Sequence, residues 1–125
     1  MSGVCFFCNL ENNKKIIDGK LAFVIKDDFP VTKHHSLIIP KRHFESFFDV
    51  TDNELLEINE LLKIRKTQIS GEDSTVQGFN VGINIGLVAG QSIFHLHVHL
   101  IPRRKGDVIS PKGGVRGIIP KKRSY

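Results

Sequence analysis

The sequence has no long hydrophobic run and very few cysteines. None of its apolar stretches reaches the roughly 20 residues that a membrane-spanning helix needs, and its N-terminus shows no basic segment followed by an apolar one. Only two cysteines occur, spaced Cys5-x-x-Cys8. We therefore expect a cytoplasmic protein, in which such a pair serves as metal ligands or redox-active thiols more often than as a structural disulfide.

Internal repeats and low-complexity segments are also absent. At 125 residues, of which 40% are hydrophobic, the chain is large enough for one core and too small for two. Much of the net charge of +5 follows Pro102. This excess suggests an anionic partner, although a solvated basic tail explains it as well. Aromatic residues do not alternate with the basic ones, so we expect no long nucleic acid partner.

Local patterns predict a mixed structure of strands and one helix. Strand composition marks residues 21–25 and 36–39, and strand periodicity marks residues 77–85. A capping box in Thr51-Asp52-Asn53-Glu54 predicts a helix that starts there and runs to about Ile69. A stripe at helical spacing should face the core; its members are Leu55, Ile58, Leu61, Leu62, Arg65 and Ile69. Strands joined by short turns, with a helix packed across them, favour an α+β domain with a largely antiparallel sheet.

Three histidines, His95, His97 and His99, stand at alternate positions. Alternate side chains of a strand point to opposite faces, so the histidines should share one face. The other face would then pack through Phe94, Leu96, Val98 and Leu100. A half-buried strand whose polar face happens to be histidine is the plain alternative. However, half of the chain's six histidines lie here, and the nearby Gly90-Gln91-Ser92 offers donors suited to an anion.

A His-x-His-x-His strand can also be a set of metal ligands. Such a set would make the protein a metal-dependent hydrolase or a metal-binding module. Against this, no strong carboxylate companion lies near the strand in sequence, and Gln91-Ser92 would have no obvious role.

These segments resemble the histidine triad family of nucleotide hydrolases and transferases. The likeness lies in His-Leu-His-Val-His-Leu-Ile at 95–101, in the preceding Gly-Gln-Ser, and in His-Ser-Leu-Ile-Ile-Pro-Lys-Arg-His at 35–43. The resemblance implies a five-stranded antiparallel sheet with one long helix and a short N-terminal helix, and a homodimer that forms one continuous sheet. We place the family domain at residues 1–105 and treat 106–125 as its basic C-terminal extension.

The resemblance also implies a reaction for the histidines. His97 would attack the α-phosphorus of a nucleotide and form a nucleotidyl-histidine, which water cleaves. A neutral imidazole can do this, because it is nucleophilic and leaves readily once phosphorylated. We expect a backbone carbonyl to hold its other ring nitrogen, since no acidic residue neighbours the motif. His99 would contact a phosphate or bridging oxygen, and His35 would assist proton transfer.

Further residues match the family's substrate contacts. Asn84, Gln91 and Ser92 match phosphate-contacting positions, and Asp27 is placed to accept hydrogen bonds from ribose hydroxyls. The base site could be lined by apolar residues that are explained equally well as core: Phe6, Phe23, Ile25 and Leu37.

A structural zinc site is implied as well. In one branch of the family two N-terminal thiolates, here Cys5 and Cys8, join His43 and His95 in a closed tetrahedral set. A redox pair or two unligated thiols are the alternatives. No catalytic metal is required. The sequence departs from the family pattern at His34, which replaces a glycine and is expected to point outward or to act as a substitute ligand.

The leading function is therefore cleavage at the α-phosphate of dinucleoside polyphosphates such as diadenosine tetraphosphate, with release of a nucleoside monophosphate. The basic run Arg103-Arg104-Lys105 favours that branch. A purine nucleoside phosphoramidase with the same catalytic residues is the alternative, and a nucleotide-binding protein without turnover is a further one. We expect no membrane partner.

Overall fold

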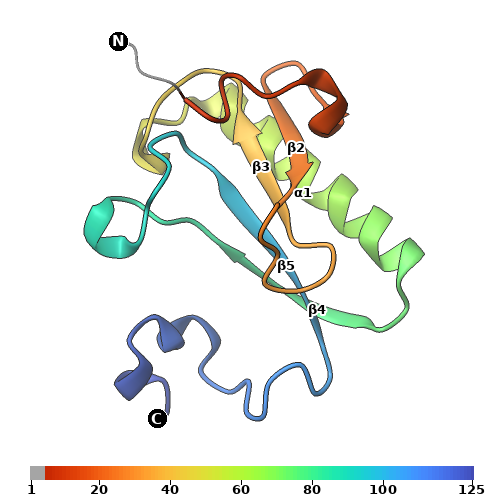
Figure 1. Ribbon diagram of the computed structural model, residues 1–125, viewed down its shortest axis with the longest axis vertical. Helices are drawn as coiled ribbons and strands as arrows, with labels where there is room; N and C mark the ends of the chain where they lie inside the picture. The colour runs from red at the N-terminus through yellow and green to blue at the C-terminus, as the bar shows by residue number, and fades with distance from the viewer. Residues whose placement is uncertain (1–4) are drawn as a thin grey trace.

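A computed structural model describes residues 5–125 as one antiparallel sheet of five strands, crossed on one face by a long helix (Figure 1). The strands are β1 (Lys15–Asp18), β2 (Ala22–Lys26), β3 (Ser36–Pro40), β4 (Val76–Gly82) and β5 (Val98–Arg104). Their order across the sheet is β1-β2-β3-β5-β4, so the last strand in the chain lies between β3 and β4. The predicted sheet and long helix are confirmed.

Helix α1 (Asp52–Glu72) begins at the predicted capping box. The Thr51 hydroxyl accepts a hydrogen bond from the Glu54 amide at 3.2 Å, and the Glu54 carboxylate accepts one from the Thr51 amide at 2.9 Å. These two bonds satisfy donors that the first helical turn leaves free. Most of the predicted stripe is buried, but Leu55 is 41% exposed, so its assignment to the core is wrong.

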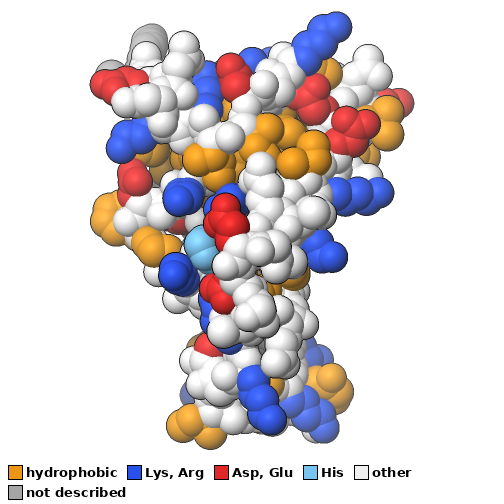
Figure 2. Space-filling view, turned by 90° about the vertical axis from the view of Figure 1, so that its right-hand side faces the viewer, with side chains coloured by type: hydrophobic (Ala, Val, Ile, Leu, Met, Phe, Trp, Pro, Cys, Tyr) orange, Lys and Arg blue, Asp and Glu red, His pale blue; other side chains and the backbone are white. Residues whose placement is uncertain are grey.

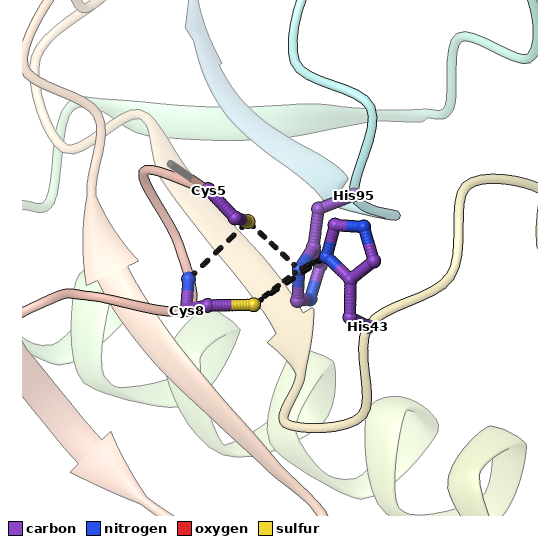
Figure 3. Close-up of side chains that lie close together, drawn as sticks. All are labelled: Cys5, Cys8, His43 and His95. Carbon is purple, nitrogen blue, oxygen red and sulfur yellow. Dashed lines mark hydrogen bonds between the residues drawn. The ribbon is translucent and has the colours of Figure 1, made fainter. Parts of the chain in front are cut away.

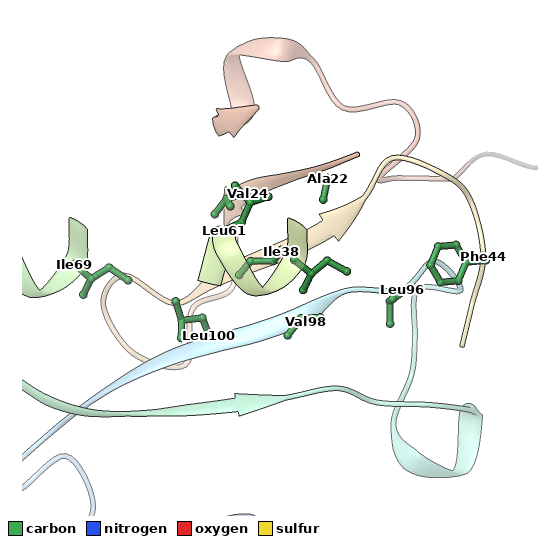
Figure 4. Packing of buried hydrophobic residues seen from close by; sticks show 10 residues of the cluster. Ala22, Val24, Ile38, Phe44, Leu61, Ile69, Leu96, Val98 and Leu100 are labelled. Carbon is green, nitrogen blue, oxygen red and sulfur yellow. The ribbon is translucent and has the colours of Figure 1, made fainter. Parts of the chain in front are cut away.

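The core fills the space between α1 and the sheet (Figure 4). Leu96, Val98 and Leu100 belong to it, as the alternation predicts, whereas Phe94 is 43% exposed. Phe94 departs from the pattern because β5 starts only at Val98, so the chain is not yet extended at residue 94. A second cluster covers the opposite face of β2 and β3, which are therefore buried on both faces: Phe7, Phe23, Ile25, Leu37 and Ile39.

Several smaller elements differ from the prediction. β1 was not predicted, and β4 ends at Gly82, three positions before the predicted end. Where a short N-terminal helix was expected, the described chain has one turn of 3-10 helix over Asn12–Lys14. Other 3-10 helices are Phe47–Asp49, Leu87–Ala89, Gly114–Ile118 and Pro120–Lys122.

The C-terminal segment after β5 extends beyond the sheet. Figure 1 shows it past β4, and Figure 2 shows a narrow extension below the body with basic side chains at its tip. Across residues 5–125, no helix combines the length and the apolar character that crossing a membrane would take.

Candidate functional site

The histidine run keeps its alternation although only its last member lies in a strand. His95 and His97 precede β5 and are buried, and His99 lies within it and is partly exposed. The Leu96 amide donates to the Phe44 carbonyl at 2.7 Å, which holds the run extended before β5 begins. The His97 and His99 rings lie side by side, with centroids 5.2 Å apart, whereas His95 faces the two cysteines.

The His97 ring is oriented by its own backbone. Its Nδ1 donates a hydrogen bond to the His95 carbonyl oxygen at 2.9 Å, so the acceptor is a backbone carbonyl, as expected. The proton of the neutral ring is thereby assigned to Nδ1, which leaves the lone pair on Nε2. His97 lines a cavity of about 570 Å³, and this nitrogen is the ring's free nucleophilic atom.

His35 and His99 form a second, connected pair. The Val31 amide donates to His35 Nδ1 at 3.0 Å, so the neutral His35 ring carries its proton on Nε2. That Nε2 lies 2.9 Å from His99 Nδ1 and 3.4 Å from an Asp27 carboxylate oxygen. If His35 donates to His99, then His99 carries its own proton on Nε2 and offers it as a donor.

Burial keeps both of these rings neutral. It lowers the pKa of His35, with Asp27 opposing the shift. It also lowers the pKa of His99 to about 4, helped by the neighbouring His97 and His35 and opposed by Asp27. His99 is therefore an uncharged hydrogen-bond donor at neutral pH.

The same tautomer argues against a catalytic metal between these groups. Ligand atoms of Asp27, His35 and His99 lie within 4.8 Å of one another, close enough to hold an ion. However, a metal on His35 Nε2 needs a lone pair there, and the Val31 amide assigns the lone pair of the neutral ring to Nδ1. The His-x-His-x-His run does not form one metal set either, because His95 groups with Cys5, Cys8 and His43, His99 groups with Asp27 and His35, and His97 belongs to neither group.

The cavity is lined by both apolar and polar side chains. The apolar ones include Phe6, Phe7, Ile25, Leu37 and Ile93, and the polar ones are Asp27, Asp28, His35, Asn84, Ser92, His97 and His99. Of the expected base-site residues, only Phe23 does not line it, because its side chain packs in the second core cluster. One oxygen of Asp27 accepts from the Phe29 amide at 2.8 Å, which fixes the carboxylate at the rim.

Gln91 does not line the cavity. Its side chain is buried, accepts from the Gly86 amide at 2.9 Å, and donates to the carbonyls of Glu45 and Ile93 at 3.1 and 3.2 Å. These bonds use both ends of the amide, so the residue joins three backbone segments rather than presenting donors to a ligand. Ser92, the next residue, is exposed and lines the cavity.

The four predicted zinc ligands converge (Figure 3). Cys5 Sγ lies 3.3 Å from His95 Nδ1, Cys8 Sγ lies 3.4 Å from His43 Nδ1, and the two Nδ1 atoms are 3.1 Å apart. A tetrahedral zinc ion with its usual bond lengths places sulfur and nitrogen ligands roughly 3.5 Å apart and two nitrogens roughly 3.3 Å apart. The separations therefore fit zinc.

The chemistry of the donor set also fits a cation. His95 Nε2 donates to the Pro40 carbonyl at 2.7 Å, which leaves the Nδ1 lone pair directed at the thiols and at His43. Burial, the hydrogen bond that the Cys8 thiol makes to Cys5, and the charge of Cys5 raise the pKa of Cys8 to about 11, so these surroundings oppose ionisation of the Cys8 thiol. A bound cation would remove this opposition. Four protein ligands leave no open position, as in a structural site.

His34 has neither of its expected roles. Its backbone lies in the left-handed region with φ +75°, a conformation that favours glycine, which is the residue that the resemblance implies at this position. The side chain is mostly buried and its Nε2 lies 3.8 Å from Asp73, which also pairs with Arg104 at 3.0 Å. It therefore points toward the end of α1, away from solvent and from the cysteines.

The matches to known proteins agree with this geometry. The HIT domain family model matches residues 10–106. An uncharacterised HIT-like protein of Methanocaldococcus jannaschii is 34% identical over 108 residues, which cover 83% of this chain and 82% of that protein. An AP-4-A phosphorylase of Mycobacterium tuberculosis is 34% identical over 88% of this chain and 57% of its own length. A solved Zn-bound histidine triad family protein of Mycobacterium smegmatis has a TM-score of 0.72, with 31% identity over 85% of this chain and 79% of that chain.

Proposed function

This chain belongs to the HIT domain family of nucleotide-processing hydrolases and transferases, and from that premise we propose that it cleaves nucleotides at the α-phosphate through a nucleotidyl-histidine. The observation that carries the proposal is that two neighbouring imidazole rings line one cavity, one with a free lone pair and the other with an N–H donor. His97 offers Nε2 as nucleophile, and the adjacent His99 offers an N–H.

The two steps follow from these protonation states. His97 Nε2 bonds to phosphorus while the bond to the leaving group breaks. A leaving oxygen departs as an anion that accepts a hydrogen bond from His99 Nε2–H, and a leaving nitrogen takes a proton from the Ser92 hydroxyl. The His95 carbonyl accepts a hydrogen bond from the Nδ1–H of the resulting positively charged His97 ring and so stabilises the ring. In the second step water bonds to phosphorus as the bond to His97 breaks, and it gives up a proton to Ser92 where that residue has donated one and otherwise to solvent. The monophosphate and neutral His97 are released.

The cavity suits a nucleoside monophosphate unit. A carboxylate such as Asp27 can accept from both vicinal ribose hydroxyls, and Phe6, Ile25 and Leu37 form an apolar wall for the base. Asn84 and Ser92 line the same cavity as His97 and His99 and would contact the phosphate. Gln91 would act there only by holding the loop that carries Ser92.

For the substrate class, we propose dinucleoside polyphosphates. The relative named AP-4-A phosphorylase supports this class, although this chain spans only 57% of that protein. The basic run that favoured the same class gives less support than expected. Arg103 pairs with Asp107 at 2.8 Å and Arg104 pairs with Asp73 at 3.0 Å, so both charges are matched within the chain.

A specific observation favours nucleoside phosphoramidates as a second candidate. A second cleft of about 700 Å³ is lined mainly by aliphatic side chains. It shares five lining residues with the nucleoside cavity: Val31, His35, Asn84, Gly90 and His99. The one lysine or arginine on its described lining is Arg103, which is bonded to Asp107 and Asn80. An uncharged amine would fit such a cleft better than a polyphosphate would.

The Cys5, Cys8, His43 and His95 set is proposed to hold one structural zinc ion. The separations and the Zn-bound relative support this assignment. Zinc there would fasten the N-terminal segment to the residue that orients His97. The homodimer with a continuous sheet stays a prediction, and it would use β4, which is an edge strand. A cytoplasmic location stays a proposal that fits two free thiols.

The test is AMP release from diadenosine tetraphosphate and from an adenosine phosphoramidate, in buffer without added divalent cations. We expect wild type to release AMP and His97→Ala to release none, with Phe48→Ala as a control because Phe48 is 81% exposed and does not line the cavity. Equal release by wild type and His97→Ala would refute the mechanism. The ratio of the two substrates' kcat/KM values decides between the two classes.

A further inference from the structure

The loop that carries the two cysteines also builds part of the nucleoside cavity. Phe6 and Phe7 stand between Cys5 and Cys8, and both line the cavity together with His97. Phe6 lies at the rim and is 49% exposed, whereas Phe7 is buried in the second core cluster. The chain between two metal ligands is therefore a wall of the substrate site.

Phe7 also contacts the nucleophile directly. Its ring packs edge to face against the His97 ring, with centroids 5.1 Å apart and an interplanar angle of 61°. It packs against His95 in a similar way at 5.8 Å and 84°. These contacts limit rotation of the His97 ring about its single hydrogen bond to the His95 carbonyl.

The loop has few polar attachments to the rest of the protein. Cys5, Cys8 and Asn9 make hydrogen bonds within the loop, at 2.8 to 3.4 Å. Within the described chain, every hydrogen bond from residues 5–9 to a residue outside the loop joins a thiol to His43 or His95. The position of the loop thus depends on the metal-ligand set and on the packing of Phe7.

We infer that metal occupancy of the Cys5, Cys8, His43 and His95 set controls nucleotide binding, because the metal holds Phe6 and Phe7 in place as a wall of the cavity and as a support for His97. This inference rests on the proposed nucleotide site. Phe7 is a positioning residue, since it acts through His97. Because coupling between two ligands is reciprocal, a bound nucleotide should retain the metal by the same factor by which the metal tightens nucleotide binding.

The experiment measures AMP binding by titration calorimetry, with zinc-loaded wild type and with reduced protein freed of zinc by a chelator. We expect removal of zinc to weaken AMP binding about tenfold, which is the effect of losing one or two aromatic contacts. Zinc release to a coloured chelator should be slower with AMP present, and the zinc dissociation constant should change by the factor seen for AMP. Circular dichroism reports whether the zinc-free protein stays folded.

A pair of matched variants decides the question if the zinc-free protein unfolds. Phe7→Leu should keep one zinc per chain, weaken AMP binding and lower kcat because His97 loses its support. Phe48→Leu makes the same chemical change at an exposed ring outside the cavity and should alter neither quantity. Equal AMP binding by the two variants, or by loaded and zinc-free folded wild type, overturns the coupling.

The outcomes also separate this inference from the proposed function. If loaded wild type binds AMP with the same affinity as folded zinc-free protein, the coupling is wrong and the nucleotide site stands. If loaded wild type does not bind AMP, the nucleotide site and the coupling both fail.

Discussion

Replacing Gln91 with alanine tests whether this residue is part of the scaffold or contacts the substrate. The substitution would leave three backbone groups without their partners: the Gly86 amide and the carbonyls of Glu45 and Ile93. A buried polar group that loses its partner costs about 1–3 kcal/mol. Gly86, Glu45 and Ile93 are partly or fully exposed, so water can reach some of these groups, and the cost for each group is near the lower figure of about 1 kcal/mol. For the three groups together, we expect Gln91→Ala to lower the free energy of unfolding by about 3 kcal/mol.

The assay is urea unfolding followed by circular dichroism, together with kcat and KM on the substrate that proves active. Ser92→Ala is the matched control, since Ser92 is exposed, lines the cavity and makes no hydrogen bond within the described chain. It should change stability by no more than about 0.5 kcal/mol and still lower activity. The scaffold assignment is refuted if Gln91→Ala leaves stability unchanged and lowers kcat/KM as Ser92→Ala does.

Two further predictions concern stability. The pKa of His99 is lowered to about 4 from 6.5, so between these pH values the unfolded chain binds more protons than the folded one. The free energy of unfolding should therefore fall as pH drops from about 7 to 4, by up to about 3 kcal/mol from this residue, and the fall should be smaller in His99→Gln. At His34, with φ +75°, His34→Gly should stay within about 1 kcal/mol of wild type and His34→Val should lose about 2 kcal/mol in urea unfolding. Equal stability of the two variants would contradict the backbone argument.

The sequence predicts those features that depend on local pattern. The capping box places the start of α1 at Thr51, and alternation assigns Leu96, Val98 and Leu100 to the core. The spacing of His95, His97 and His99 marks a run of which His97 and His99 line the cavity and His95 faces the two cysteines. Each of these signals depends on the chain within a few residues of itself.

Other features have no such signal. The donor that fixes the His35 tautomer is the Val31 backbone amide, which every residue except proline carries. The side-chain amide of Gln91 could bind a phosphate or backbone groups with the same atoms. Only the distances in the structure show that it bonds to three backbone groups. β1 was not predicted because it has only four residues and its pairing with β2 includes a shift of register. Phe94 was assigned to the core because the sequence does not show where β5 begins.

The position of β5 sets the order in which the protein can mature. This strand is the last to be synthesised, yet it occupies the interior of the sheet, between β3 and β4. Cys5 cannot contact His95 until that residue, 90 positions later in the chain, has been synthesised. A growing chain can therefore form the hairpin of β2 and β3 early, but β4 finds no neighbour until residues 98–104 have left the ribosome. The set of Cys5, Cys8, His43 and His95 can therefore bind a metal only after synthesis has passed β5, and the protein becomes able to bind a ligand only then. Chains that end before β5 should be degraded by proteases rather than accumulate as partly active species.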